Sequence, residues 1–265
     1  MPNRRQFLGL IGAAPVAALT GTGAARAGQS QAGLAAARPA RTIAWSGFTW
    51  DVKDSGERRA GPGGNLFSAS RRSVRVDTQG RLRLRIERRG GRWRCAEVIA
   101  REPGAFGYGA YAWTLATPPR AVAPHAILGL FTWDNASDEQ ANREIDVEIG
   151  LWRNDPEGHT TLFAVQPTSV AGNKLEFDLP RRAAPVTVGF TWRPGEVEFR
   201  AAHGTMLDPA DPSLLIRRWT RATTAVPTPG MEQPHINLWL DDHAPPTAGK
   251  PVEVALASFS FTPLA

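Results

Sequence analysis

From Ile43 onward the sequence is a series of short runs in which apolar and polar residues alternate, and this pattern constrains the fold more than any other feature. Alternation is the period of a β-strand, because successive side chains point to opposite faces of a sheet. The runs are separated by turn residues, and the chain holds 26 Gly and 22 Pro. No long segment has a convincing helical period. Many strands at short spacing predict an all-β fold, either a sandwich or a barrel.

The first residues have the features of an export signal. Arg4 and Arg5 are followed by Phe7 and an apolar run, which closes with the small-residue pattern Ala-Arg-Ala at 25–27. Paired arginines before such a run predict a twin-arginine signal peptide over residues 1–27, removed after export. A plain secretory signal or a membrane anchor is the alternative. The run is short and rich in Gly and Ala, so we do not expect a stable anchor.

The remaining chain divides into a linker and one domain. Residues 28–41 are rich in Ala, Gly and Gln without periodicity, which predicts a flexible linker. Residues 42–265 have a length typical of one large β-sandwich. We expect a monomer that uses the twin-arginine export machinery and works in the periplasm or outside the cell.

The charge and the rarer residue types exclude several classes of function. The formal net charge is +6, and the first 27 residues account for half of it, which leaves about +3 for the rest. The densest basic run, from Arg81 to Arg89, alternates with Leu82, Leu84 and Ile86, which indicates a solvated strand face rather than a nucleic-acid groove. An acidic polysaccharide is a less favoured partner for this face.

Metal and disulfide chemistry are not expected either. Cys95 is the only cysteine, so no internal disulfide can form. The five His residues show no metal-ligand spacing. We therefore expect neither a metal nor a cofactor.

The run NREIDVEIG sets three carboxylates in a row. Glu144, Asp146 and Glu148 alternate with Ile145 and Val147. Residues i, i+2 and i+4 of a strand share one face. Carboxylates this close repel one another, so at least one should titrate abnormally.

The spacing of the row suits glycoside hydrolysis. The Cα atoms of Glu144 and Glu148 should lie about 13 Å apart on a strand. Inward-leaning side chains on a concave sheet could bring the carboxyls to about 6 Å, between the roughly 5–5.5 Å of retaining and the roughly 6.5–9.5 Å of inverting glycosidases. The estimate leans towards retention without settling it. The charge of Asp146 favours a protonated neighbour, which a general acid needs.

The row has a simpler interpretation as an exposed acidic strand face, which is common in antiparallel sheets. Two observations count against it. No Lys or Thr interrupts the row, and Trp133 and Trp152 flank it. Flat indole rings suit the faces of sugars, although core packing is the commoner use of any single Trp.

Several segments together resemble a known enzyme family. REIDVE matches the E-x-D-x-E signature of glycoside hydrolase family 16. Other segments resemble the lichenase-type β-glucanases of that family, in the same order over residues 45–262: RCAEVIA, GYGAYAWTL, LGLFTW, FTWRPGEVEFRAAHG and INLWL.

The resemblance implies a β-jelly roll of the concanavalin A-like kind, with two curved antiparallel sheets and a cleft on the concave face. It also implies endo-acting, retaining cleavage of a β-glycosidic bond in a β-glucan-like polysaccharide. By position, Glu144 would be the nucleophile, Glu148 the acid/base and Asp146 the residue that tunes them. Substrate contacts are expected from Glu97, Trp133, Trp152, Gln166, Asn65 and Trp239.

Departures from the lichenases limit what the resemblance implies. Ile99 stands where they have an Arg, Asn142 and Arg143 where they have a Trp, and Gln166 close to the place of an Asn. The calcium-binding Asp of their last strand has no counterpart in VEVALAS, so calcium is not assumed. The same carboxylates would also serve a transglycosylase. A non-catalytic, lectin-like carbohydrate-binding protein is the third hypothesis, although such a protein has no reason to keep all three carboxylates.

Overall fold

The computed structural model describes residues 41–119, 122–153, 158–180 and 185–264. The predicted signal peptide (1–27) and nearly all of the predicted linker (28–41) lie outside these residues. Arg41 already begins the first strand. No helix in the described part of the chain is long and apolar enough to span a membrane.

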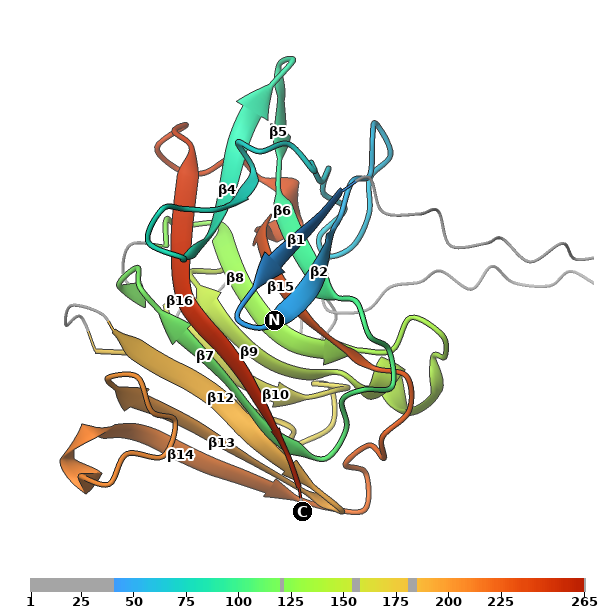
Figure 1. Ribbon diagram of the computed structural model, residues 1–265, viewed down its shortest axis with the longest axis vertical. Helices are drawn as coiled ribbons and strands as arrows, with labels where there is room; N and C mark the ends of the chain where they lie inside the picture. Colours follow the sequence, from blue (N-terminus) through green and yellow to red (C-terminus); the bar gives the residue numbers. More distant parts are fainter. Residues whose placement is uncertain (1–40, 120–121, 154–157, 181–184, 265) are drawn as a thin grey trace, which may run out of the picture. The chain divides into compact units, whose positions relative to one another are not determined.

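Two antiparallel sheets account for the fold (Figure 1). The first sheet has the order β1 (Arg41–Trp45), β2 (Phe48–Val52), β6 (Ala96–Ala100), β15 (Gln233–Leu240), β8 (Ala126–Trp133), β9 (Ile145–Gly150), β10 (Thr161–Val165) and β11 (Lys174–Phe177). The second has the order β14 (Leu215–Ala222), β13 (Glu196–His203), β12 (Val186–Arg193), β7 (Gly109–Leu115), β16 (Val252–Pro263), β4 (Leu82–Arg89) and β3 (Val74–Val76). A short strand, β5 (Arg92–Arg94), pairs with β4.

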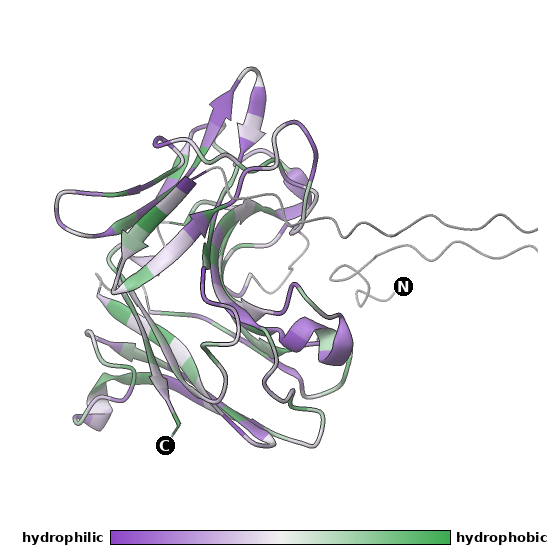
Figure 2. Cartoon of the chain, turned by 45° about the vertical axis from the view of Figure 1, so that its right-hand side comes forward, coloured by the Kyte–Doolittle hydropathy of each residue, from purple (hydrophilic) through white to green (hydrophobic). Residues whose placement is uncertain are grey.

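Helical structure is limited to short 3-10 segments among the described residues: η2 (Glu139–Arg143), η3 (Pro212–Leu214) and η4 (Asp241–His243). Many neighbours within a sheet are distant in sequence, as β15 is from β6 and β8. This all-β sandwich with crossed connections confirms the predicted jelly-roll fold. The strands of the first sheet are curved (Figure 2).

The hydrophobic core lies between the sheets. Phe163 of β10 stacks on Phe199 of β13, with ring centroids 5.1 Å apart. Trp50 of β2 meets Phe259 of β16 edge-on at 5.3 Å. The strands of the first sheet thus turn alternate side chains into the core and the others towards the outer face.

Candidate active site

The row of three carboxylates lies on the outer face of the first sheet. Ile145, Val147 and Ile149 are buried in the core, so the residues that alternate with them face the other way. Asp146 lies opposite Phe131 of β8 and Ala164 of β10.

The row begins one residue before β9 and continues within it. Glu148 lies opposite Gly129 and Leu162. Glu144 comes just before the strand, and its carbonyl oxygen accepts from the backbone N–H of Gln166 at 3.1 Å, which continues the pairing with β10. We name this surface the carboxylate face.

Asp146 is buried, Glu144 and Glu148 are half-buried, and all three carboxyls have raised pKa values. Burial, followed by the charges of Asp146 and Glu148, raises the pKa of Glu144 well above its ordinary value. Burial raises the pKa of Asp146 to about 7, although hydrogen bonds with Gln166 and Glu144 act in the opposite direction. Burial, with the charges of Asp146 and Asp241, raises the pKa of Glu148 to about 8, against the effect of a hydrogen bond with Trp239.

Gln166 fixes the central carboxyl. Its Nε2 donates to Asp146 Oδ2 at 2.9 Å. Its Oε1 accepts from the backbone N–H of Thr168 at 3.0 Å. Because that backbone donor identifies the oxygen end of the amide, the nitrogen end must face Asp146. Gln166 was predicted to contact substrate; it lies beside the carboxylates, and the contact with substrate stays a prediction.

A line of side chains crosses the carboxylate face from β2 to β9. In the register of the strands, Lys53, Glu97, Asn237, Gly129 and Glu148 are successive neighbours. Asn237 Oδ1 accepts from the backbone N–H of Gly129 at 3.2 Å. A Cβ at position 129 would lie 2.5 Å from that oxygen, so only glycine fits beneath the Asn237 side chain.

Glu97 is buried in this line and both of its oxygens are engaged. Lys53 Nζ lies 2.7 Å from Oε2, and His235 Nδ1 lies 2.9 Å from Oε1. Burial acts to raise the pKa of Glu97, but the Lys53 charge and the His235 hydrogen bond outweigh it and lower the pKa. The lichenases have an Arg at the position of Ile99. Here Lys53 supplies the positive charge beside Glu97, and His235 supplies a hydrogen-bond donor. The predicted contact between Glu97 and sugar hydroxyls stays a prediction.

His235 is a buried partner that the sequence reasoning missed. Burial lowers the pKa of its ring despite the adjacent Glu97. The imidazole packs on Phe131 with ring centroids 5.0 Å apart. Alternation could have placed His235 on the face of Asn237, two residues later in the same strand. Its pairing with Glu97 joins residues 138 apart in sequence.

The three predicted tryptophans occupy different positions. Trp133 ends β8, is half-buried and lies on the carboxylate face, two residues after Phe131. Trp152, beyond the end of β9, packs against the hydrophobic core. Trp239 of β15 is 3% exposed, on the same face as Asn237.

Asn65 holds a loop against the strand that carries Trp239. Its Nδ2 donates to the carbonyl oxygens of Leu240 at 2.8 Å and Pro62 at 2.9 Å. A Cβ on Gly63, in the same loop, would lie 2.9 Å from the Trp239 ring. The predicted contact between Asn65 and a sugar stays a prediction.

The residues just before Glu144 form an unusual left-handed turn. Gln140, Ala141, Asn142 and Arg143 have φ angles of 51°, 53°, 57° and 54°. Four successive non-glycine residues in this region are strained, so the surrounding contacts must hold them there.

Arg143 provides those contacts through its side chain. Its Nη1 donates to Asp134 Oδ2 at 2.9 Å and its Nε to the carbonyl oxygen of Thr228 at 3.0 Å. Its own carbonyl oxygen accepts from Thr132 Oγ1 at 2.8 Å. A Cβ on Gly230 would lie 2.4 Å from Nε, which shows how closely the loop covers the guanidinium. We call this set of contacts the Arg143 clamp; it fixes the backbone that leads into Glu144.

The described residues contain no group of three or more His, Cys, Asp or Glu side chains arranged to hold a metal ion. The expectation that neither metal nor cofactor takes part stays a prediction.

Comparison with known proteins identifies the fold. No protein-family model matches the sequence, and no curated protein matches it. Among solved structures, the chain is similar to the β-glucanase of Bacillus licheniformis, with 18% identity, a TM-score of 0.57, and coverage of 81% of this chain and 92% of that one. At identities this low the likeness shows the fold alone.

Two further solved structures share the fold but differ in how they are described. One, described as an immunostimulatory antigen and pseudo β-1,3-glucanase of Mycobacterium tuberculosis, has 18% identity and a TM-score of 0.57 over 82% of this chain and 91% of that one. The other, a Bacteroides ovatus family 16 protein in complex with the product G4G4G3G, has 13% identity and a TM-score of 0.58 over 80% and 94%. The chain therefore has the sandwich of the family 16 β-glucanases.

Proposed function

We propose that this chain is a glycoside hydrolase that cleaves internal β-glycosidic bonds of a β-glucan-like polysaccharide. One observation carries the proposal: Glu144, Asp146 and Glu148 share one face of a strand, and the pKa of each is raised. On an exposed acidic face only mutual repulsion would raise the pKa values, whereas here burial is the largest cause of each shift. A general acid near neutral pH needs a pKa raised in this way. The β-glucanases with the same fold support the substrate class.

The reaction we propose is double displacement with retention. Glu144, as a carboxylate, attacks the anomeric carbon while Glu148 gives its proton to the departing glycosidic oxygen, which leaves a covalent glycosyl-enzyme. Glu148, now a carboxylate, takes a proton from water, and the water oxygen displaces Glu144 from the same carbon. Glu144 is again a free carboxylate and Glu148 is again protonated.

Asp146 is the neighbour that can take the proton of Glu144 before the attack. Glu144 and Asp146 share a hydrogen bond between carboxyls, which requires a proton on one of them. In the free chain that proton belongs to Glu144, because the bond raises the pKa of Glu144 and lowers that of Asp146. Once the proton has passed to Asp146, Glu144 is charged and able to attack. A pKa of about 8 keeps Glu148 protonated at neutral pH, as a general acid must be.

A non-catalytic carbohydrate-binding protein is the second candidate. It is favoured by the neighbour described as a pseudo β-1,3-glucanase, which has the same fold. Transglycosylation differs from hydrolysis only in the acceptor, a sugar hydroxyl in place of water.

Incubation with β-1,3-glucan, β-1,3-1,4-glucan, galactan and carrageenan tests these alternatives. We expect shortened chains and new reducing ends of retained configuration from at least one of them. Glu144→Gln should abolish the activity, and Glu148→Gln should lower it by about 10²–10⁴-fold. Glu196→Gln, in an exposed ion pair on β13, is the control. Glycan binding without cleavage supports the lectin-like protein, and lengthened chains without new reducing ends support the transglycosylase.

We further propose that the enzyme acts as a monomer, without metal or cofactor, in the periplasm or outside the cell after twin-arginine export. Arg4 and Arg5 support the export route. Changing both to Lys should leave the precursor in the cytoplasm; normal export of that variant contradicts the route.

A further inference from the structure

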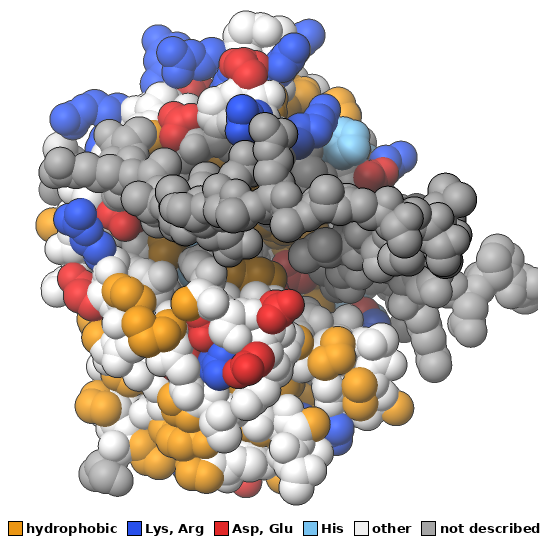
Figure 3. All heavy atoms as spheres, turned by 90° about the vertical axis from the view of Figure 1, so that its right-hand side faces the viewer, with side chains coloured by type: hydrophobic (Ala, Val, Ile, Leu, Met, Phe, Trp, Pro, Cys, Tyr) orange, Lys and Arg blue, Asp and Glu red, His pale blue; other side chains and the backbone are white. Residues whose placement is uncertain are grey.

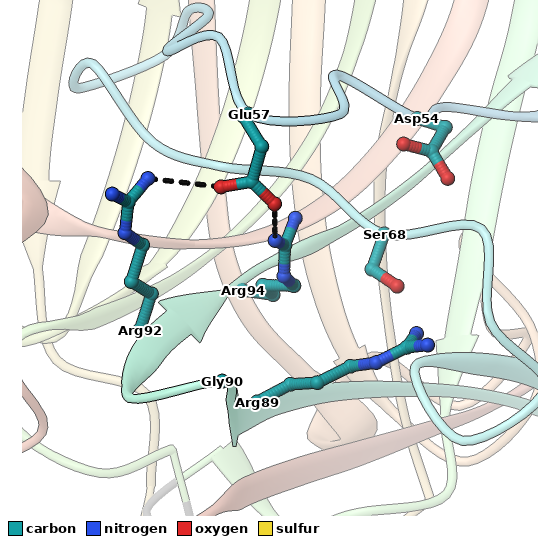
Figure 4. Close-up of a pocket in the computed structure, with 7 residues that line it drawn as sticks. All are labelled: Asp54, Glu57, Ser68, Arg89, Gly90, Arg92 and Arg94. Carbon is teal, nitrogen blue, oxygen red and sulfur yellow. Dashed lines mark hydrogen bonds and ion pairs between the residues drawn. The ribbon is translucent and has the colours of Figure 1, made fainter.

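Arginines gather around the hairpin formed by β4 and β5 and line two hollows that share Arg89. The first, of about 520 Å³, also has Arg92 and Arg94 in its wall (Figure 4). The second, of about 350 Å³, has Arg71, Arg72 and Arg88. We call these six residues the basic hairpin surface. The hairpin is strongly hydrophilic (Figure 2), and basic side chains gather at that end of the molecule (Figure 3).

The turn of the hairpin forces two of these charges together. Gly90 and Gly91 have φ angles of 56° and 77°, as a tight two-residue hairpin turn requires. Arg89 is therefore directly opposite Arg92. Like charges at directly opposed positions destabilise a strand pair, so the hairpin keeps an arrangement that its own folding does not favour.

The carboxylates nearby neutralise only part of this charge. Glu57 binds both Arg92, at 2.9 Å, and Arg94, whose Nη1 also donates to the carbonyl oxygen of Gly56 at 2.8 Å. Asp54 instead accepts backbone N–H groups of its own loop. These contacts hold Arg92 and Arg94 in place at the wall of the hollow.

Among the described residues, no carboxylate pairs with Arg71, Arg72, Arg88 or Arg89. Glu87 accepts hydroxyl groups from Ser70 and Ser73 at 3.3 Å. Within the described chain, the Arg89 side chain has neither a hydrogen bond nor an ion pair. It lies extended along the hollow towards the side where Ser68 and Asp54 lie (Figure 4). Six arginines thus face three carboxylates that are already engaged, which leaves guanidinium groups free for an external anion.

We propose that the basic hairpin surface binds the anionic groups, carboxylate or sulfate, of a polysaccharide. The idea rests on the proposed function, because it identifies the substrate as an anionic glycan. Guanidinium groups match the planar or multi-oxygen anions of uronic acids and sulfate esters.

The surface is joined to the carboxylate face by two short stretches of chain. Arg94 ends β5 and Glu97 lies three residues later in β6, so at most about 10 Å of extended chain separates them. In the loop after β2, Lys53 pairs with Glu97 while Glu57 pairs with Arg94. A polysaccharide that passes over Glu97 can therefore reach the hairpin within a few sugar units.

A nucleic acid is the other polyanion to consider. Proteins that bind single strands add aromatic side chains on which bases stack, and neither hollow has an aromatic residue in its lining. The position beside the candidate active site also favours a glycan.

Binding measurements on the full chain test the proposal. In a Glu144→Gln background, we would measure affinity for polygalacturonate, carrageenan, neutral β-1,3-glucan and single-stranded DNA at low and physiological salt. Arg89→Gln should weaken binding of the preferred anionic glycan about fivefold to tenfold and leave the neutral glucan unaffected. Salt should weaken only the anionic interaction. Preference for polygalacturonate or for carrageenan identifies carboxylate or sulfate.

Arg193→Gln is the matched control, since it removes one positive charge from an exposed pair on β12. Equal effects of the two substitutions, failure to bind either anionic glycan, or tighter binding of the DNA each overturn the proposal. Failure of the proposed function is separate: it appears as wild-type cleavage by the Glu144→Gln variant, or as no cleavage by the parent, with the effect of Arg89→Gln on binding unchanged.

Discussion

At the scale of single residues, the carboxylate row shows what alternation can predict. The positions of Glu144, Asp146 and Glu148 on one face followed from a period of two. The hydrogen-bond partners that oppose the rise of their pKa values did not, because Gln166, just after β10, and Trp239, on β15, come from elsewhere in the chain. The same holds for Glu97, whose partner Lys53 is 44 residues away. Pairing across strands depends on register, which no single segment encodes.

Asp146→Asn should shift the pH dependence of cleavage towards acid. The charge of Asp146 raises the pKa of both Glu144 and Glu148, so its removal lowers both. Glu144 then becomes charged, and Glu148 loses its proton, at lower pH. Both limbs of the kcat/KM profile should move in that direction, with a smaller loss of rate than in Glu144→Gln. An unmoved profile contradicts the role of Asp146.

The two flanking tryptophans should respond differently to substitution. Trp133 lies on the carboxylate face, whereas Trp152 packs against the core. Trp133→Ala should raise KM several-fold with little change in unfolding temperature. Trp152→Ala should lower stability measurably in a urea titration, by less than the roughly 3 kcal/mol lost with a fully buried aromatic, because Trp152 is half-buried. Similar losses of stability in both variants would show that Trp133 is a core residue as well.

At the scale of elements, strands were easier to predict than the turns that orient the residues at their ends. The run over Arg81–Arg89 was expected to be a half-buried strand, and Leu82, Leu84 and Ile86 are fully buried in β4. The turn at Asn142 and Arg143 had no such signal, because left-handed turns are normally marked by glycine. Tertiary contacts from β8 and from the segment before β15 hold this turn.

Substitution of Arg143 should therefore affect both stability and rate. Arg143→Ala leaves Asp134 buried without its partner and should lower the unfolding free energy by about 3 kcal/mol. Arg143→Lys keeps the charge but loses the forked contact with Asp134 and Thr228. It should lower kcat with little change in KM, since the backbone before Glu144 is no longer fixed.

Arg193→Ala provides the comparison for the clamp. Its pair with Glu196 is exposed, so the expected loss is below about 1 kcal/mol with kcat unchanged. A wild-type kcat for Arg143→Lys, or equal stability losses for the two alanine variants, contradicts the role of the clamp.

At the scale of the whole molecule, the carboxylate face should make stability depend on pH. A carboxyl with a raised pKa holds its proton more tightly in the folded chain. Its contribution is fully present below the unfolded pKa, near 4, and is lost as pH rises through the folded pKa. That value is about 7 for Asp146 and about 8 for Glu148. His235, with its lowered pKa, acts in the opposite sense only below about pH 7.

The unfolding free energy should consequently fall between pH 7 and pH 8.5. Urea titrations at several pH values would measure the fall, which we expect to exceed about 1 kcal/mol. Glu148→Gln carries no charge at any pH and should flatten the dependence. A stability that rises over this range, or a fall of the same size in Glu148→Gln, contradicts the raised pKa values.

Gly129 has a consequence for how this site could diversify. Because the Asn237 side chain covers it, neither position can change alone without a collision or an uncovered amide. A lineage that altered the sugar contacts here would have to pass through a paired substitution, with Asn237 shortened as a side chain appears at 129. That requirement makes the middle of the line from Lys53 to Glu148 resistant to gradual drift.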